Sequence, residues 1–295
     1  MYPVQIMIAG AQKAGTSSLT GYLSQHPGIC THPQLEMMYF AVDDIYAQGY
    51  ERAFQRYFSH RINHQKVILA KNVGIMYLPK ATRRLQEHNP SIQVIIVLRH
   101  PVDRAYSAYW YARRMGWENL KTFEEAISAD PSRFENDPGP KRIGSYLDRS
   151  LYAKHIQQML NIFPVEQLHI YLLEDLQANP ESICQGIFKR LEIDESFVPN
   201  TEYSKNKAAQ PRDGRINWVF SSPHPIPGTV RRIVRILFPD RVGDILKIRL
   251  RKTIEREFLP PKMDPETRRK LLDYFCPYNE ELSGLLDRDL SSWCK

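Results

Sequence analysis

The 295-residue sequence predicts an α/β fold in which a central parallel sheet lies between two layers of helices. Short apolar runs rich in β-branched residues alternate with longer helical patterns, which is typical of parallel strands joined by helical crossovers. These runs are apolar over most of their length, as expected for strands that are buried on both faces. With 42% hydrophobic and 25% charged residues, the composition is that of a globular protein with a substantial core.

Four strands are predicted because each run is short, apolar and followed by turn or helix signals. They are Val4–Ala9, Val67–Ala70, Val94–Leu98 and Leu168–Leu173. Helical spacing of apolar residues predicts helices at Ser17–Ser24, Pro79–Glu87, Arg104–Arg114, Phe123–Ala129 and Leu151–Ile162. The tail from Asp264 is also predicted to be helical, because Pro265 suits the first turn of a helix. No apolar run is long enough to span a bilayer.

Residues 1–295 are predicted to form one domain with a basic irregular or helical insertion or lid at about residues 208–260. Proline and glycine predict an exposed loop at Pro131–Arg142 and irregular structure at Gln210–Gly228. Two basic helices are predicted at Val230–Leu237 and Ile245–Arg256.

The positive charge is concentrated in one stretch. Thr229–Lys252 holds eight basic and two acidic residues, a net +6 of the total +7. The rest of the chain is near neutral, which argues against a nucleic-acid binder. The stretch could contact an acidic saccharide, a membrane surface or a partner subunit, or it is an ordinary solvated face.

The first predicted strand runs directly into a loop, GAQKAGTSS from Gly10, and then into a helix. Backbone N–H groups of such a loop and the helix dipole bind phosphate-like anions. Gly15 allows a close backbone approach and Lys13 adds a charge. Hydroxyl donors follow at Thr16, Ser17 and Ser18. An ordinary strand-to-helix turn capped by threonine and serine is the alternative.

The loop departs from a Walker A loop in one respect. Gly10 and Gly15 have the Walker spacing, but the lysine lies inside the loop at Lys13, and Thr16 stands where the Walker lysine belongs. A nucleotide γ-phosphoryl group is normally handled with a metal ion held in part by a strand-end aspartate. A sulfuryl group carries one fewer negative charge, so lysine and backbone donors suffice. The departure favours sulfuryl chemistry, and no metal is predicted.

The third predicted strand ends in arginine instead of aspartate. Arg99 is followed by HPVDRAYSAY, in which Pro101 ends the strand and a helix begins near Asp103. A turn and part of a helix can bring Ser107 toward the same strand end. The arginine fork and the serine hydroxyl suit a phosphate, although Arg99 could instead be a surface ion-pairing residue.

Together, GAQKAGTSSL and LRHPVDRAYSAY resemble the two nucleotide-binding motifs of sulfotransferases that use 3′-phosphoadenosine 5′-phosphosulfate (PAPS). LEMMYF and AKN resemble two segments of the heparan-type branch, with Leu35 in place of a lysine and Ala70 in place of a glutamate. LYAKHIQQMLNIFP and the tail to Trp293 are similar to bacterial members. The resemblance covers most of the chain, is weakest over Gln210–Glu257, and departs at His100, where many members have asparagine or aspartate.

This resemblance implies a P-loop-like three-layer α/β/α sandwich with PAPS as co-substrate and 3′,5′-ADP as product. The 5′-phosphosulfate would be held by Lys13, Ala14, Gly15, Thr16, Ser17 and Ser18. The 3′-phosphate would be held by Arg99 and Ser107. A polar stretch containing Asn206, Lys207 and Arg212 is expected to close over the nucleotide.

Sulfuryl transfer needs a base for the acceptor proton and positive charge at the leaving oxygen. Lys13 is the candidate for the leaving oxygen, and as a general acid. Glu36 is the preferred base, because it begins an apolar run whose burial would raise its pKa and because the resemblance points to it. His32 is an alternative base. Lys71 directly follows the second strand and is a candidate for contacting the sulfate or orienting the acceptor.

Each of these residues also has an ordinary interpretation. Glu36 could be a solvated helix residue, His32 a loop residue and Lys71 an exposed lysine. The apolar residues after Glu36 could line an acceptor pocket, but core packing is the expected role; they are Met37, Met38, Tyr39 and Phe40.

The predicted activity is transfer of a sulfuryl group to a hydroxyl or amine of a small metabolite or saccharide, as in secondary metabolism. One alternative is a P-loop kinase or nucleotide-binding protein that uses Mg-ATP, with Glu174 or Asp175 as metal ligand. Another is a non-catalytic binder of nucleotide or anionic saccharide. Four scattered cysteines and the lack of a leader pattern predict a cytoplasmic protein with reduced thiols. The oligomeric state stays open.

Overall fold

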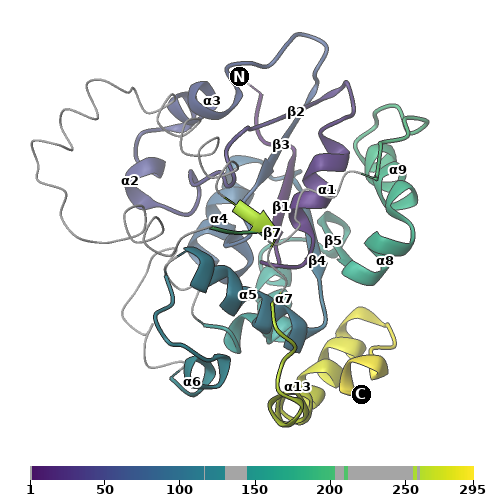
Figure 1. Cartoon of the computed structure of the whole chain (residues 1–295). Helices are drawn as coiled ribbons and strands as arrows, with labels where there is room; N and C mark the ends of the chain where they lie inside the picture. Colours follow the sequence, from purple (N-terminus) through teal and green to yellow (C-terminus); the bar gives the residue numbers. More distant parts are fainter. Residues whose placement is uncertain (1, 116, 130–144, 203–208, 212–254, 258–259) are drawn as a thin grey trace, which may run out of the picture.

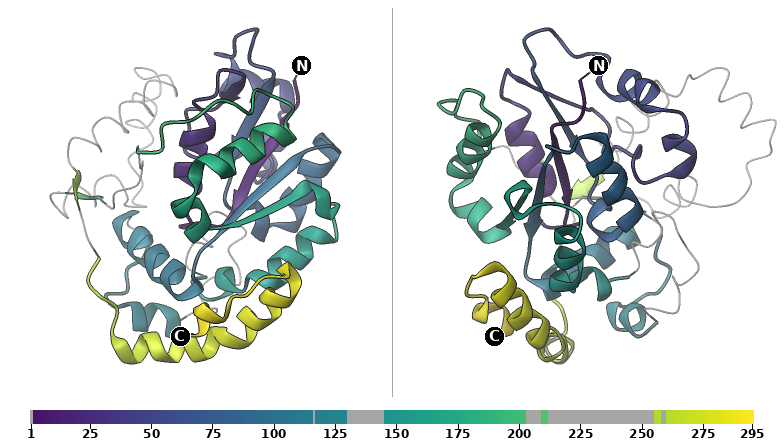
Figure 2. Two further views of the ribbon diagram at one scale, coloured as in Figure 1. Left: turned by 90° about the vertical axis from the view of Figure 1, so that its right-hand side faces the viewer. Right: turned by 180° about the vertical axis from the view of Figure 1, so that it is seen from behind.

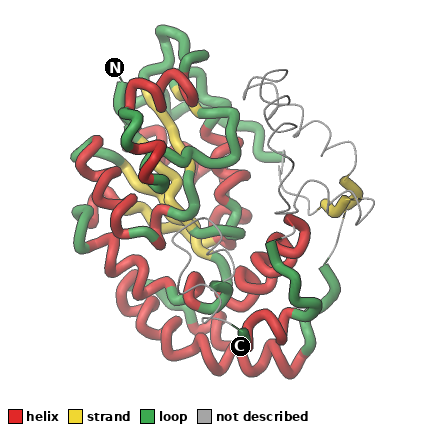
Figure 3. Tube along the Cα trace, turned by 90° about the vertical axis from the view of Figure 1, so that its left-hand side faces the viewer, coloured by secondary structure: helices red, strands yellow, loops and turns green. Residues whose placement is uncertain are grey.

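The computed structural model describes residues 2–115, 117–129, 145–202, 209–211, 255–257 and 260–295. Its centre is a parallel sheet of five strands, drawn in yellow among the helices in Figure 3. The strands are β1 (Ile6–Gly10), β2 (Ile29–Thr31), β3 (Val67–Lys71), β4 (Gln93–Leu98) and β5 (Leu168–Leu172). Their order in space is β2-β3-β1-β4-β5. The predicted α/β fold with a central parallel sheet is confirmed.

Helices cover both faces of the sheet (Figures 1 and 2). On one side lie α1 (Thr16–Leu23), α8 (Leu173–Ala178) and α9 (Pro180–Arg190), and on the other α4 (Pro79–His88) and α7 (Tyr152–Leu160). Every residue of β1 and β3 is buried, so the centre of the sheet is covered on both faces. Shorter elements complete the layers: α2 (Asp43–Tyr46), α3 (Tyr50–Phe58), and the 3₁₀ helices η1 (Ile75–Tyr77), η3 (Asp148–Ser150) and η4 (Val165–Gln167).

A second buried cluster joins α5 (Pro101–Met115), α6 (Phe123–Ser128) and the long C-terminal helix α13 (Pro265–Leu286). Arg104 on α5 is fully buried, and its guanidinium donates to the Ser150 hydroxyl at 2.6 Å and to the carbonyl oxygen of Tyr146. Such charge-assisted bonds fix the helix against the segment before α7. The helix that carries Ser107 is therefore held from two sides.

The strand order determines where a ligand can bind. Ile6 of β1 is paired with Leu69 of β3 on one side and with Gln93 of β4 on the other. The chain passes from β1 to β2 and β3 and then crosses to β4 on the opposite side of β1. Open α/β sheets bind ligands at the carboxyl ends of strands where the order reverses in this way. The ends of β3, β1 and β4 form that position here.

The structure corrects several predicted boundaries. The strand β2 was not predicted, since its three residues are too few to show a pattern. The helix α5 begins at Pro101 and not near Asp103, because proline fits the first turn of a helix. The helix predicted over Ile245–Arg256 is wrong at its end, where β7 (Glu255–Glu257) pairs antiparallel with β6 (Ala209–Pro211). The remainder of that helix lies outside the described residues, as do Pro131–Arg142, Val230–Leu237 and most of the basic insertion.

The prediction that all thiols are reduced is wrong. Cys276 on α13 and Cys294 on the 3₁₀ helix η5 (Ser291–Cys294) form a disulfide. The sequence spacing hides this pair, because the turn after α13 returns the chain alongside the helix. Cys30 and Cys184 are buried free thiols. Within the described ranges, no helix combines the length and apolar character needed to cross a membrane.

Candidate active site

The loop between β1 and α1 lies at the carboxyl edge of the central strand. Gly15 is the N-cap of α1 with φ 89°, a left-handed conformation that favours glycine, and no side chain caps the helix. No acidic residue lies in the first turn, so the positive end of the dipole is available to an anion, together with the N–H groups that precede Ser18, whose own N–H donates to the Gly15 carbonyl oxygen at 3.0 Å. Ala14 and Thr16 are buried, while Ser17 and Ser18 are half-buried on the first turn of the helix.

Lys13 also adopts a left-handed backbone, with φ 69°. Its Nζ lies over the ring of Tyr111 on α5, 4.8 Å from the ring centroid, which is a cation–π contact. Burial and, to a smaller extent, the positive charges of Arg114, Arg99 and Lys71 together lower the pKa of Lys13 to about 8. The side chains of Arg114, Arg99 and Lys71 are therefore near enough to Lys13 for their charges to act on it.

Arg99 directly follows β4 and connects the two predicted motifs. Its Nη1 donates a hydrogen bond to the carbonyl oxygen of Lys13 at 3.3 Å. The carbonyl oxygen of Arg99 in turn accepts a 2.8 Å hydrogen bond from the hydroxyl of Tyr152 on α7. The structure thus brings Lys13 and Arg99 together. Ser107 is half-buried on α5, one helical turn before Tyr111.

Glu36 and Lys71 form a largely buried ion pair beside this edge. Nζ of Lys71 donates to one carboxylate oxygen of Glu36 at 2.7 Å, and the N–H of Val73 donates to the other at 2.9 Å. Burial raises the pKa of Glu36, and the charge and hydrogen bonds of Lys71 oppose that rise. Glu36 lies in the loop after β2 and is not a solvated helix residue. Lys71 is the last residue of β3 and is 4% exposed, so it is not an ordinary surface lysine.

The structure places His32 in a different environment from Glu36. Its Nε2 accepts the Lys71 N–H at 3.0 Å, and its Nδ1 lies 2.8 Å from the carbonyl oxygen of Gln34, so Nδ1 carries the proton. Burial lowers its pKa to about 4. Because both ring nitrogens bond to the backbone, His32 has no lone pair for an acceptor proton, and the geometry favours Glu36.

Sequence reasoning missed three residues that support the site: Asn72, Tyr111 and Tyr152. The side-chain amide of Asn72 donates to the Met37 carbonyl at 2.8 Å, and its oxygen accepts the Gly74 N–H at 2.9 Å, which ties the Glu36 loop to the end of β3. Its place directly after Lys71 at a strand end was the available signal. Most of the apolar run after Glu36 is buried in the core, as expected: Met37, Tyr39 and Phe40.

Other predicted features cannot be placed at this edge. Asn206, Lys207 and Arg212 lie outside the described residues. Among the residues that the structure describes, no cluster of three or more histidine, cysteine, aspartate or glutamate side chains is arranged to hold a metal ion. Asp175, the candidate metal ligand of a kinase, is instead paired with Arg288 at 2.5 Å. The absence of a required metal stays a prediction.

The family model for the sulfotransferase domain matches residues 3–213. The chain belongs to the sulfotransferase family. The predicted enzyme class, a PAPS-dependent sulfotransferase, is confirmed, and the kinase alternative finds no support. The match includes both motifs and the Glu36–Lys71 pair.

Curated relatives of this sulfotransferase have names that refer to heparan sulfate. The chain is 26% identical over 288 residues to the heparan sulfate glucosamine 3-O-sulfotransferase 5 of Mus musculus, and the match covers 97% of this chain and 72% of the relative. It is 25% identical over 306 residues to the bifunctional heparan sulfate N-deacetylase/N-sulfotransferase 1 of Xenopus tropicalis, covering 99% of this chain but 31% of the relative. The crystal structure of a sulfotransferase from Alicyclobacillus acidocaldarius shares the fold, with a TM-score of 0.71, 23% identity and full coverage of both chains.

Proposed function

We propose that this sulfotransferase moves the sulfuryl group of PAPS to a hydroxyl or amine of a saccharide or small metabolite and releases 3′,5′-ADP. The observation that carries the proposal is the convergence of Lys13, Arg99 and Lys71 at the ends of three adjacent strands. Clustered cations beside an uncapped helix N-terminus match a ligand that bears several negative charges.

The donor is bound by the two loops that Arg99 connects. The N–H groups at the start of α1, with the hydroxyls of Thr16, Ser17 and Ser18, hold the 5′-phosphosulfate. Lys13 places its charge beside the same group. Arg99 and Ser107 hold the 3′-phosphate, for which the guanidinium provides a two-pronged donor. Asn206, Lys207 and Arg212 complete the nucleotide site in this proposal.

Glu36 acts as the base of the transfer. The acceptor oxygen or nitrogen forms a new bond to sulfur as its proton passes to the Glu36 carboxylate. The bond between sulfur and the bridging oxygen breaks, and its electron pair stays on the 5′-phosphate of 3′,5′-ADP. Lys13 stabilises the charge that develops there, and Lys71 holds the carboxylate in position.

The acceptor class is supported by the relatives, whose names refer to heparan sulfate glucosamine. A glucosamine offers both hydroxyl and amine groups, in agreement with the predicted acceptor. We extend the proposal to a single domain over residues 1–295, with the basic segment of about residues 208–260 covering the site. A cytoplasmic location stays a prediction, and the Cys276–Cys294 disulfide counts against it, because such bonds are rare in reducing compartments.

The proposal is tested in two assays on the full chain. Calorimetry with 3′,5′-ADP should show saturable binding in the presence of a metal chelator. A screen with PAPS carrying labelled sulfate should then transfer label to an amino sugar, an oligosaccharide or a small phenol. Binding of ATP that depends on Mg²⁺, with no affinity for 3′,5′-ADP, would contradict the proposal and support the kinase alternative. Binding of 3′,5′-ADP without transfer to any acceptor would leave a nucleotide-binding protein.

A further inference from the structure

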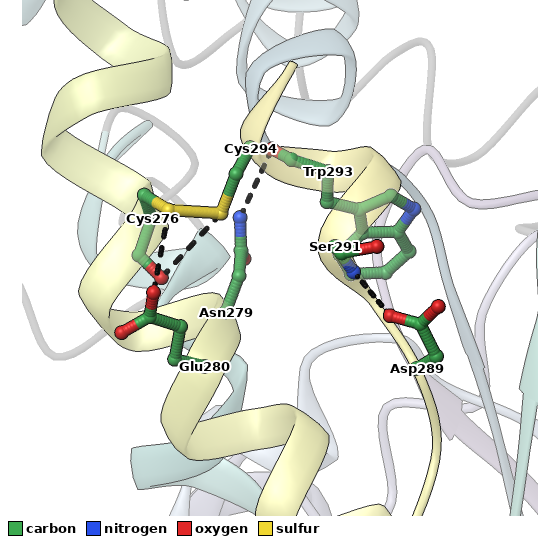
Figure 4. Close-up of a disulfide and its surroundings, with 7 residues drawn as sticks. All are labelled: Cys276, Asn279, Glu280, Asp289, Ser291, Trp293 and Cys294. Atoms are coloured by element: carbon green, nitrogen blue, oxygen red, sulfur yellow. Dashed lines mark hydrogen bonds between the residues drawn. A yellow bond between two sulfur atoms is a disulfide. The ribbon is translucent and has the colours of Figure 1, made fainter.

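The Cys276–Cys294 disulfide joins the 3₁₀ helix η5 to the middle of α13 (Figure 4). Both cysteines are partly exposed, whereas Cys30 and Cys184 are buried. A reductant in solution can therefore reach this bond, while the other two thiols are shielded.

Trp293 directly precedes the disulfide-bonded Cys294. Its side chain is 3% exposed, and its carbonyl oxygen accepts a 3.2 Å hydrogen bond from the side-chain amide of Asn279, one helical turn after Cys276 (Figure 4). The indole packs on two other rings, with centroid distances of 6.0 Å to His100 and 6.2 Å to Tyr152. Both ring contacts lie within the range of favourable aromatic pairs.

Both of these rings belong to residues that are bonded to Arg99, one through the peptide chain and one through a hydrogen bond. His100 is the next residue in the chain, and the hydroxyl of Tyr152 donates to the carbonyl oxygen of Arg99 at 2.8 Å. Tyr152 is 1% exposed, so its position depends on what packs against it. A continuous series of contacts thus runs from the disulfide through Trp293 and Tyr152 to the arginine that faces the donor site.

We propose that the Cys276–Cys294 disulfide is a redox-controlled latch on the donor site, in which Trp293 is a positioning residue for Arg99. With the disulfide closed, Trp293 holds Tyr152 and His100, and Arg99 is set for the donor. With the disulfide reduced, the segment that carries Trp293 separates more readily from α13 and donor affinity falls. This inference rests on the proposed function, because it assumes that Arg99 binds the donor.

The opening step is thiol–disulfide exchange with a dithiol. One thiolate of the dithiol attacks a sulfur of the disulfide, and the other cysteine leaves as a thiolate that takes up a proton. The second sulfur of the dithiol then displaces the first cysteine. The dithiol is oxidised to a cyclic disulfide, and Cys276 and Cys294 are reduced to two thiols.

The test compares the untreated full chain with the same protein treated with dithiothreitol. Maleimide labelling after denaturation should count two thiols in the untreated protein and four in the reduced one. Calorimetry should show that reduction weakens the binding of 3′,5′-ADP about fivefold or more. The KM for PAPS should rise to the same extent, with kcat changed less, because the latch acts on a binding residue and not on the base.

Variants separate positioning from a general loss of stability. The double variant Cys276→Ser/Cys294→Ser should bind 3′,5′-ADP as weakly as the reduced protein and should not respond to dithiothreitol. Cys184→Ser, which removes a buried free thiol, should respond as the original chain does. Tyr152→Phe removes the bond to Arg99 and should weaken binding and reduce the response to dithiothreitol. If reduction unfolds the protein, the oxidised Trp293→Phe and Trp293→Ala variants provide the test instead. Trp293→Phe should bind 3′,5′-ADP more tightly than Trp293→Ala, because it keeps an aromatic ring.

Three results would overturn the latch: four reactive thiols in the untreated protein, equal affinity of the oxidised and reduced forms, or normal affinity of Trp293→Ala. Each of these leaves the proposed function intact. Oxidised protein that binds no 3′,5′-ADP at all would contradict the proposed function, and the latch with it.

Discussion

The two oxygens of the Glu36 carboxylate have different partners, Nζ of Lys71 at 2.7 Å and the N–H of Val73 at 2.9 Å. Both donors come from the end of β3 and the turn that follows it. The carboxylate therefore cannot rotate without losing one of two charge-assisted hydrogen bonds. In the proposed mechanism, this restraint means that Glu36 accepts a proton from one direction, as a positioned acceptor requires.

Glu36→Gln keeps the size of the side chain but removes the proton acceptor. We expect turnover to fall by about 100-fold or more, in the range of a lost general base. The affinity for 3′,5′-ADP should be unchanged, because the nucleotide contacts come from other residues. Glu166→Gln, at an exposed glutamate, is the matched control and should behave as the original chain. Unchanged turnover of Glu36→Gln would remove Glu36 from the mechanism.

The pH dependence of kcat/KM should have two limbs. Glu36 works when deprotonated, so the rate should rise with pH through a pKa above the ordinary carboxyl value, because burial raises it. Lys13 works when charged, and burial among other cations lowers its pKa to about 8, so the rate should fall again as the pH rises past that value. In Lys13→Arg, the fall should move to higher pH, since arginine stays charged. A falling limb that is the same in both proteins would exclude Lys13 as its origin.

Arg99→Ala should weaken 3′,5′-ADP binding by about 10- to 100-fold, the loss expected for hydrogen bonds from a charged donor. Arg99→Lys should recover only part of the affinity, because an ammonium group lacks the two-pronged geometry. Calorimetry measures both. Arg83→Ala, at an exposed arginine of α4, is the control. Equal affinities of the Arg99→Ala variant and the original chain would mean that the 3′-phosphate binds elsewhere.

Gly15→Ala places a Cβ on a residue with φ 89° and 2.7 Å from the Cδ1 of Leu173. We expect a loss of about 1–3 kcal/mol in the free energy of unfolding, measured by urea denaturation. Donor binding should weaken as well, because the N-cap of α1 must shift. Gly186→Ala is the matched control, since its Cβ meets no atom within 4 Å on helix α9, and it should stabilise by about 0.5–1 kcal/mol. A neutral Gly15→Ala would show that the loop relaxes freely.

The positions of the three cationic residues were predictable, because each lies at or just after the end of a largely apolar strand. Lys13, Lys71 and Arg99 stand where β1, β3 and β4 end, and parallel strands bring such ends together. The neighbours of these residues were not predictable. The Tyr111 ring reaches Lys13 from α5 and the Tyr152 hydroxyl reaches Arg99 from α7, and no spacing in the sequence encodes either contact.

The fold was predictable because its longer strands are largely apolar. The features that the sequence did not reveal are a very short strand and a disulfide. The strand β2 has three residues at an edge of the sheet, so periodicity could not reveal it. The disulfide pairs cysteines 18 residues apart, a distance that only the turn after α13 closes. His32 could not be assigned from sequence, because its role depends on a backbone N–H 39 residues away.

Because β1 lies between β3 and β4, the proposed donor site forms only when segments distant in the sequence come together. Residues 13, 71 and 99 come from separate crossover units and meet only after all three have docked. Loop closure over such separations is slow, so the site is a late event in refolding. A fluorescent analogue of 3′,5′-ADP, added during refolding, would therefore report completion of the native topology and not the earlier appearance of helices.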